Sequence, residues 1–160
     1  MAAPKWSGSA ATLIPRLKND MCPPEITAAI IQIVLTHDPT VQAIYLFGSY
    51  GTEDEWADSD LDIALLMPPE TAKSVGHLMM SPLRSALERL LGREVDLLNA
   101  RQVSTVFQKE IVMAERRIYA ANEYAADEFE MRTLSSYQKL NQERAEVLAE
   151  GARSGRFYDV

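Results

Sequence analysis

Six acidic side chains occur between Gly48 and Asp62, and no basic residue lies among them. Asp60 and Asp62 are two residues apart at the start of an apolar run, so in an extended chain both carboxylates project from one face. Two neighbouring carboxylates repel each other, and a cation relieves this repulsion. Because Mg²⁺ prefers oxygen ligands, the pair predicts a magnesium site. A D-x-D tripeptide alone, however, is more often an exposed acidic turn.

Gly48 and Ser49 end the apolar run that precedes this stretch. Glycine lets backbone N–H groups approach an anion closely, and the Ser49 hydroxyl is a donor for a phosphate oxygen. If the runs 41–47 and 61–67 pair as strands, the Gly-Ser turn lies beside the aspartates. The turn then holds a triphosphate, and the carboxylates hold metal ions that stabilise the attacking and leaving oxygens of an in-line displacement.

A third carboxylate, Asp96, lies in the short apolar segment "EVDLL" between Val95 and Leu97. A carboxylate is unfavourable inside a short apolar strand, so its presence there suggests a functional role. We interpret Asp96 as a ligand of the catalytic metal, as the base that accepts the proton of the nucleophile, or as both. The alternative is a strand-end aspartate that caps a loop.

The elements that must position these residues follow from the hydrophobic pattern. It predicts helices over 23–38, most of 70–92, 102–116 around Val106, Ile111 and Met113, and 121–151, and strands over 41–47, 61–67, 94–99 and 117–120. A turn with a short helical piece is expected at 48–55, Gly92 is expected to end one helix, and Gly151 and Gly155 are expected to break the last. This order predicts an α+β fold with a small mixed sheet flanked by helices and a long C-terminal helix. We expect one domain: a flexible lead over 1–20, a core over 21–120, and a helical arm over 121–160.

The charge of the chain is concentrated rather than spread. The 160 residues carry a net charge of -7, most of it in the acidic stretch. An acidic balance argues against direct nucleic-acid binding, which needs a basic face. The single cysteine, Cys22, fits a reducing compartment, and no segment has the length and apolarity of a membrane span or a signal peptide. We therefore expect a cytoplasmic protein.

The pattern Gly48-Ser49, ten residues, then Asp60-Leu61-Asp62 resembles the signature of the DNA polymerase β-like nucleotidyltransferase superfamily, and Asp96 resembles its third aspartate. Within that superfamily, residues 24–158 are most similar to the minimal nucleotidyltransferases, in particular to MNT-domain antitoxins that are paired with HEPN-domain toxins. The resemblance implies a nucleotidyltransferase fold. It also implies a hetero-oligomeric complex with a HEPN toxin.

The activity implied by the resemblance is Mg²⁺-dependent transfer of AMP from ATP to a tyrosine hydroxyl of the cognate HEPN ribonuclease, which is thereby silenced. By position, Gly48 and Ser49 would hold the phosphates of ATP. The three aspartates Asp60, Asp62 and Asp96 would bind the metal and activate the nucleophile. One position departs from the pattern: many relatives have glycine where this chain has Glu53, so we expect a differently shaped turn.

Two other functions are compatible with the sequence. The chain resembles aminoglycoside- and lincosamide-modifying nucleotidyltransferases in the same signature, although those enzymes usually carry a further helical domain. It is also compatible with a non-catalytic antitoxin that neutralises a toxin by contact alone.

The remaining residues of the acidic stretch have expected structural roles. We expect Trp56 to pin the loop to the core, with stacking on a nucleotide base as the alternative. Ser59 is expected to cap the turn, and Tyr50 fits a packing role and a pocket-lining role equally. The other acids are expected to form a solvated loop: Glu53, Asp54, Glu55 and Asp58.

Overall fold

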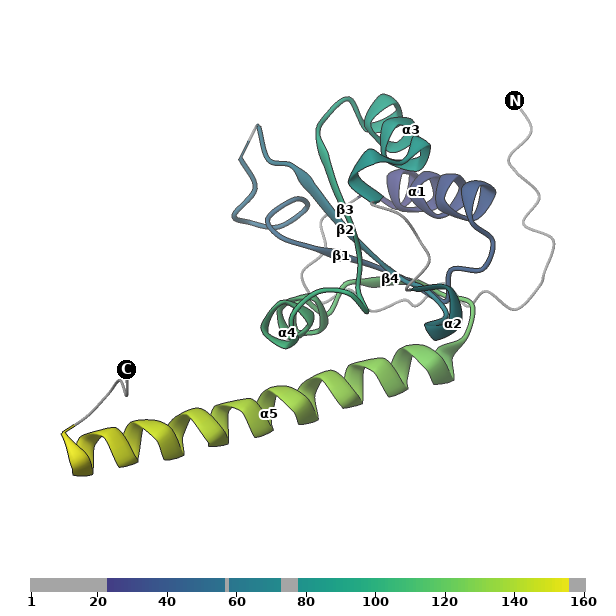
Figure 1. The fold of residues 1–160 in the computed structure, drawn as a ribbon. Helices are drawn as coiled ribbons and strands as arrows, with labels where there is room; N and C mark the ends of the chain where they lie inside the picture. Colours follow the sequence, from purple (N-terminus) through teal and green to yellow (C-terminus); the bar gives the residue numbers. More distant parts are fainter. Residues whose placement is uncertain (1–22, 57, 73–77, 156–160) are drawn as a thin grey trace, which may run out of the picture.

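A computed structural model describes residues 23–56, 58–72 and 78–155, which form a four-stranded sheet between two layers of helices (Figure 1). The strands are β1 (Ala43–Phe47), β2 (Leu61–Leu66), β3 (Val95–Asn99) and β4 (Arg117–Ala120). The helices are α1 (Pro24–His37), α2 (Pro69–Ala72), the 3₁₀ turn η1 (Leu78–Met80), α3 (Pro82–Leu91), α4 (Thr105–Met113) and α5 (Glu123–Ser154). This mixed arrangement confirms the predicted α+β class.

The sheet has the strand order β3-β2-β1-β4. β1 pairs antiparallel with β2 and β4, whereas β2 pairs parallel with β3. Every residue of β1 is buried, and β2 is buried except at Asp62. The predicted pairing of the two apolar runs and the predicted burial of the second on both faces are therefore confirmed.

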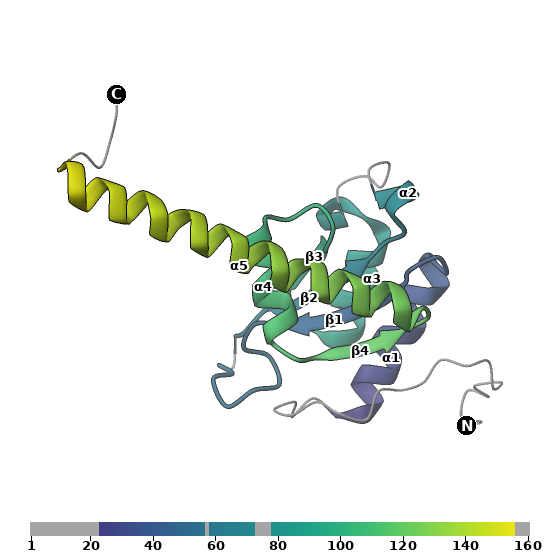
Figure 2. The same ribbon diagram turned by 90° about the horizontal axis from the view of Figure 1, so that it is seen from below.

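Two apolar cores lie on the two faces of the sheet. On one face α1 and α3 pack, with Ile30, Val34 and Leu87 against strand residues that include Leu61 and Ile63. On the other face α4 and α5 pack, and Figures 1 and 2 show both helices on this side. Since neighbouring strand residues point to opposite faces, Asp62 faces the α4 and α5 side.

Side-chain caps and left-handed glycines set the helix limits around the sheet. Ser81 accepts the N–H of Arg84 at the start of α3, and Asn122 accepts the N–H of Ala125 at the start of α5. Gly92 ends α3 at φ 65°, as predicted.

Several predicted boundaries are wrong. The expected helix over 70–92 is divided into α2, η1 and α3, because Ser81 and Pro82 start a new helix. The segment 48–55 forms turns without the expected helical piece. α4 is shorter than predicted and buries only Ile111 of its three expected core residues, leaving Val106 and Met113 exposed. Gly151 lies inside α5, which continues to Ser154, whereas Gly155 ends the helix at φ 68°, as predicted.

The first half of α5 is anchored to the sheet by a polar cluster. Arg117 Nη1 contacts Asp127 Oδ1 and Glu130 Oε1, each at 2.8 Å, and the Tyr45 hydroxyl donates to Glu130 Oε1 at 3.0 Å. Burial and the nearby Glu130 charge raise the Tyr45 pKa far above its usual range. Beyond Thr133 the helix extends away from the sheet (Figures 1 and 2).

The predicted lead and the end of the predicted arm cannot be compared with the structure. The lead over 1–20 and the last residues of the arm, 156–160, lie outside the described residues. No helix in the described part of the chain is long and apolar enough to span a membrane.

Candidate active site

The register of the parallel strands brings two of the predicted aspartates together. Asp62 of β2 and Asp96 of β3 are direct register partners, and Phe47 of β1 is the partner of Asp62 on its other side. Neighbouring strands lie about 4.8 Å apart, so the two carboxylates share one face of the sheet at its edge. Both residues are half-buried.

The electrostatics of this pair are those of crowded like charges. Burial, the charge of Asp96 and the charge of Asp60 together raise the pKa of Asp62 to about 6, and a hydrogen bond with Asp96 acts in the same direction. The buried Arg116 guanidinium opposes this rise. The site therefore holds an acid whose ionisation is disfavoured unless further positive charge arrives.

Gly48 is held in direct contact with this carboxylate. Its φ is +72°, and a Cβ at this position would lie 1.9 Å from Oδ2 of Asp62. Arg116 Nη1 donates to the Gly48 carbonyl oxygen at 3.5 Å. The absence of a side chain at residue 48 is thus required by the aspartate as well as by the turn.

Ser49 joins the two ends of the acidic loop. Its hydroxyl donates to Ser59 Oγ at 3.2 Å, and the same Oγ accepts the backbone N–H of Trp56 at 2.7 Å. Ser59 therefore caps the turn, as predicted. The link places Ser49 near the segment that leads to Asp60.

The prediction that Trp56 pins the loop to the core is wrong, because 79% of its surface is exposed. Polar contacts close the loop instead: Thr52 Oγ1 donates to the Ser49 carbonyl oxygen at 2.5 Å, and Gly51 N donates to Glu55 Oε2 at 3.0 Å. Glu53, Asp54 and Asp58 are exposed, as predicted, whereas Glu55 is exposed but also pairs with Arg93.

Asp60 is exposed just before β2, and its charge acts on Asp62. Within the described ranges, no three histidine, cysteine or acidic side chains are arranged as a metal site. The Asp62–Asp96 pair is therefore the assembled part of the predicted metal-binding set.

Two arginines at the site were not singled out by the sequence. Arg116 lies beside Gly48 and Asp62, and Arg93 lies 4.4 Å above the ring of Tyr50. Tyr50 itself is buried in the core on the α1 and α3 side, which favours its packing role. Arg116 immediately precedes β4 and Arg93 lies two residues before β3, and this position just ahead of a strand is the signal that the sequence offered.

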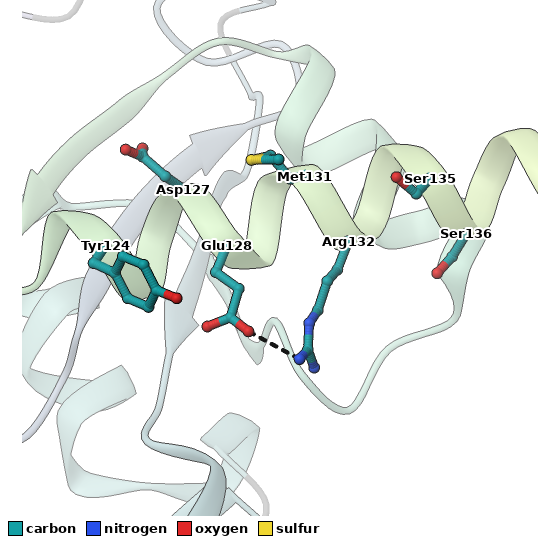
Figure 3. Close-up of a pocket in the computed structure, with 7 residues that line it drawn as sticks. All are labelled: Tyr124, Asp127, Glu128, Met131, Arg132, Ser135 and Ser136. Atoms are coloured by element: carbon teal, nitrogen blue, oxygen red, sulfur yellow. Dashed lines mark ion pairs between the residues drawn. The ribbon is translucent and has the colours of Figure 1, made fainter.

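The open hollow drawn in Figure 3 does not belong to this site. It measures about 580 Å³, and its seven labelled lining residues all come from α5. Arg132 Nη2 pairs with Glu128 Oε1 at 2.9 Å along this surface. The lining does not include the candidate-site residues Gly48, Ser49, Asp60, Asp62 and Asp96.

Comparison with known proteins agrees with the fold and with the aspartate pair. Residues 29–124 match the family described as Polymerase beta, Nucleotidyltransferase, a range that contains the Gly-Ser turn and all three aspartates. The chain belongs to this nucleotidyltransferase family.

One relative and two solved structures indicate a narrower group within this family. The chain is 32% identical over 120 residues to protein adenylyltransferase MntA of Shewanella oneidensis, covering 74% of this chain and 82% of that protein. A toxin–antitoxin structure with AMP-PNP matches with a TM-score of 0.59 at 28% identity, over 78% of this chain and 96% of that chain. A structure of tri-AMPylated Shewanella oneidensis HEPN toxin in complex with MNT antitoxin matches with a TM-score of 0.56 at 27% identity, over 79% and 95%.

Proposed function

We propose that this protein is an antitoxin that transfers AMP from ATP to a tyrosine hydroxyl of a HEPN-domain ribonuclease toxin and thereby silences it. The observation that carries the proposal is the Asp62–Asp96 register pair, packed against Gly48 in a chain of the nucleotidyltransferase family. The names of its relatives, a protein adenylyltransferase and an antitoxin in complex with an AMPylated toxin, indicate the substrates. A cytoplasmic location, where ATP is available, is part of the proposal.

The aspartates suit a magnesium ion with its nucleotide. Mg²⁺ is usually bound by one or two carboxylates together with substrate phosphates and water, so the half-buried pair supplies a fitting donor set. Asp62 and Asp96 would hold the metal, with Asp60 as a third carboxylate nearby. When bound, Mg²⁺ would neutralise charge on the triphosphate.

The chain's own residues would carry the rest of the reaction. Ser49 and the turn at Gly48 would hold phosphate oxygens. The tyrosine oxygen would attack the α-phosphorus of ATP, forming a phosphorus–oxygen bond while the bond to the leaving pyrophosphate breaks. Asp96 would accept the proton of the tyrosine hydroxyl.

The distal half of α5 is the proposed docking arm for the toxin. The helix has 32 residues and is about 48 Å long. Residues 141–150 are all exposed, and they include the large apolar side chains Val147 and Leu148. An unsupported helix is marginal in water, so a helical arm with exposed apolar residues favours a protein partner.

The docking arm can be tested separately from catalysis. Val147→Asp combined with Leu148→Asp should weaken the complex with the toxin about tenfold, because interface anchors typically contribute 1–2 kcal/mol. Gln142→Asp, on the opposite side of the helix, is the matched control and should leave the affinity unchanged. Equal affinity for all three proteins would contradict the docking role.

The central experiment mixes the protein with Mg²⁺, α-labelled ATP and the HEPN-domain toxin proposed as its partner. Label should appear on the toxin and should disappear when the acceptor tyrosine is replaced by phenylalanine. Absence of label on the toxin would contradict the proposal. If the Asp60→Asn, Asp62→Asn double variant still neutralised the toxin, the non-catalytic antitoxin would be correct instead. Transfer to aminoglycosides or lincosamides would favour the drug-modifying alternative.

A further inference from the structure

Glu55 binds two donors in the loop between the Gly-Ser turn and the aspartates. Its Oε2 accepts the backbone N–H of Gly51 at 3.0 Å, and its Oε1 pairs with Nη1 of Arg93 at 3.0 Å. The two side chains of the ion pair retain 29% and 31% exposure, so the contact borders on solvent. One carboxylate thus occupies a small anion site made by one backbone donor and one guanidinium.

Arg93 is held in place by more than this carboxylate. Its Nη1 also donates to the Ser59 carbonyl oxygen at 3.1 Å, and its guanidinium lies 4.4 Å above the ring of the buried Tyr50. The guanidinium would therefore stay near the loop if the carboxylate moved. Arg93 precedes β3, the strand that carries Asp96.

A guanidinium and a backbone N–H directed at one anion are the donors that proteins use for phosphate oxygens. The Gly51 N–H lies in the loop whose ends are Ser49 and Asp60, and Arg93 contacts this loop from the segment before β3. The hydrogen bond from Ser49 to Ser59 closes the loop. A nucleotide bound between the Gly-Ser turn and the aspartates would bring its phosphates to this region.

We propose that the Glu55 carboxylate occupies the binding position of a nucleotide phosphate group while no nucleotide is bound. On binding, this phosphate displaces the carboxylate and contacts Arg93 and the Gly51 N–H. The inference rests on the proposed function, since it needs a nucleotide at the Gly-Ser turn. It adds Arg93 to the nucleotide-binding residues and makes Glu55 an internal competitor. Binding is then weakened by the fraction of molecules in which Glu55 holds the site.

If the Glu55–Arg93 contact were a permanent structural ion pair, Glu55→Gln would weaken nucleotide binding rather than strengthen it. Glu55→Gln removes the charge that pairs with Arg93, so binding of Mg²⁺ with AMP-PNP should become about fivefold tighter by isothermal titration calorimetry. The matched control is Glu53→Gln, the same chemical change at an exposed position of the same loop, which should alter Kd less than twofold. Weaker binding by Glu55→Gln, or a gain equal to that of Glu53→Gln, would overturn the inference.

Arg93 supplies the second arm of the test. Arg93→Lys keeps the positive charge but loses the planar fork, and we expect Kd for AMP-PNP to rise about tenfold while the melting temperature stays near that of the parent. Combining it with Glu55→Gln should remove most of the gain from the glutamate change. A full gain in the double variant would show that Arg93 does not bind the phosphate.

The outcomes separate this inference from the proposed function. If the unaltered protein does not bind Mg²⁺ with AMP-PNP, the proposed function fails. If it binds the nucleotide and labels the toxin, yet Glu55→Gln does not bind more tightly than Glu53→Gln, only the displacement of Glu55 is wrong.

Discussion

The acids on the strands and the acids on the loop are held in different ways, although they are neighbours in the sequence. Asp62 and Asp96 are fixed by strand register, half-buried, and close enough for their charges to interact. Glu53, Asp54 and Asp58 are exposed on turns. The same residue types thus carry an energetic penalty in one region and almost none in the other.

The difference shows that the electrostatic destabilisation is concentrated at the strand pair. A half-buried carboxylate pair is destabilising by itself and persists because the surrounding sheet determines its position. Exposed loop acids are solvated and screened, so they need no such support. The penalty at the strand pair supports the proposed role of Asp62 and Asp96 in metal binding.

Asp62→Asn should have the largest effect. Losing one ligand charge should remove several kcal/mol of transition-state stabilisation, which corresponds to a loss of about 10³-fold in the rate of AMP transfer. The control Asp58→Asn makes the same change on the exposed loop and should change the rate less than twofold. Initial rates with labelled ATP measure both. Similar losses in the two variants would remove the distinction between strand and loop acids.

Gly48→Ala should have the next largest effect. The added Cβ would collide with the Asp62 carboxylate and force it to move, and a displacement of about 1 Å can cost about 10²-fold in rate. Gly92→Ala is the matched control, because Gly92 has a similar φ of +65° with no atom within 4 Å of the added Cβ. Both variants should lose about 1–2 kcal/mol of stability from the left-handed backbone, but only Gly48→Ala should lose activity. Comparable rate losses would indicate that backbone strain, rather than the carboxylate, explains the effect.

The pH dependence of stability should show the cost of the strand pair directly. The folded pKa of Asp62, about 6, exceeds its ordinary value of 3.8, so the unfolded chain loses this proton first as pH rises. Stability from the protonated form is full below pH 3.8 and is lost as pH rises through about 6. Asp62→Asn should therefore stabilise the metal-free protein by about 1 kcal/mol at pH 7.5, a value discounted for partial solvent exposure, and by almost nothing at pH 4.

Urea unfolding at the two pH values measures this difference, and Mg²⁺ should stabilise the parent protein at pH 7.5 by binding the ionised pair. A destabilised Asp62→Asn protein at pH 7.5 would mean that the carboxylate has a structural role.

Asp54→Asn should have the smallest effect. Removing one exposed loop charge should change the free energy of unfolding by less than about 0.5 kcal/mol at either pH. Urea unfolding beside the Asp62 variant gives the direct comparison. A pH-dependent shift at Asp54 as large as that at Asp62 would contradict the contrast between the two regions.

Much of the fold was predictable because its signals are local. The runs 41–47 and 61–67 are apolar and bounded by glycine and proline, so their strand type followed from composition, as did the burial of 61–67 on both faces. The break between α2 and α3 and the passage of α5 through Gly151 were missed, because caps and tertiary context decided between similar local propensities.

The site was predictable only in part. The spacing of Gly48, Asp60 and Asp62 identified candidates, but their contacts depend on strand register, which the sequence does not encode locally. The carboxylate of Asp62 against Gly48, and the guanidinium of Arg93 on the loop, are contacts between distant segments. Trp56 is exposed, so the expected aromatic packing is not made, and polar contacts close the loop instead.

The parallel pairing of β2 with β3 makes the aspartate pair depend on a long-range contact. More than thirty residues of sequence separate Asp62 from Asp96, and parallel strands need a crossover before they can meet. Contacts of this range form slowly, after local turns and helices. The aspartate pair therefore forms only once β3 has docked beside β2, so the proposed activity depends on this long-range pairing.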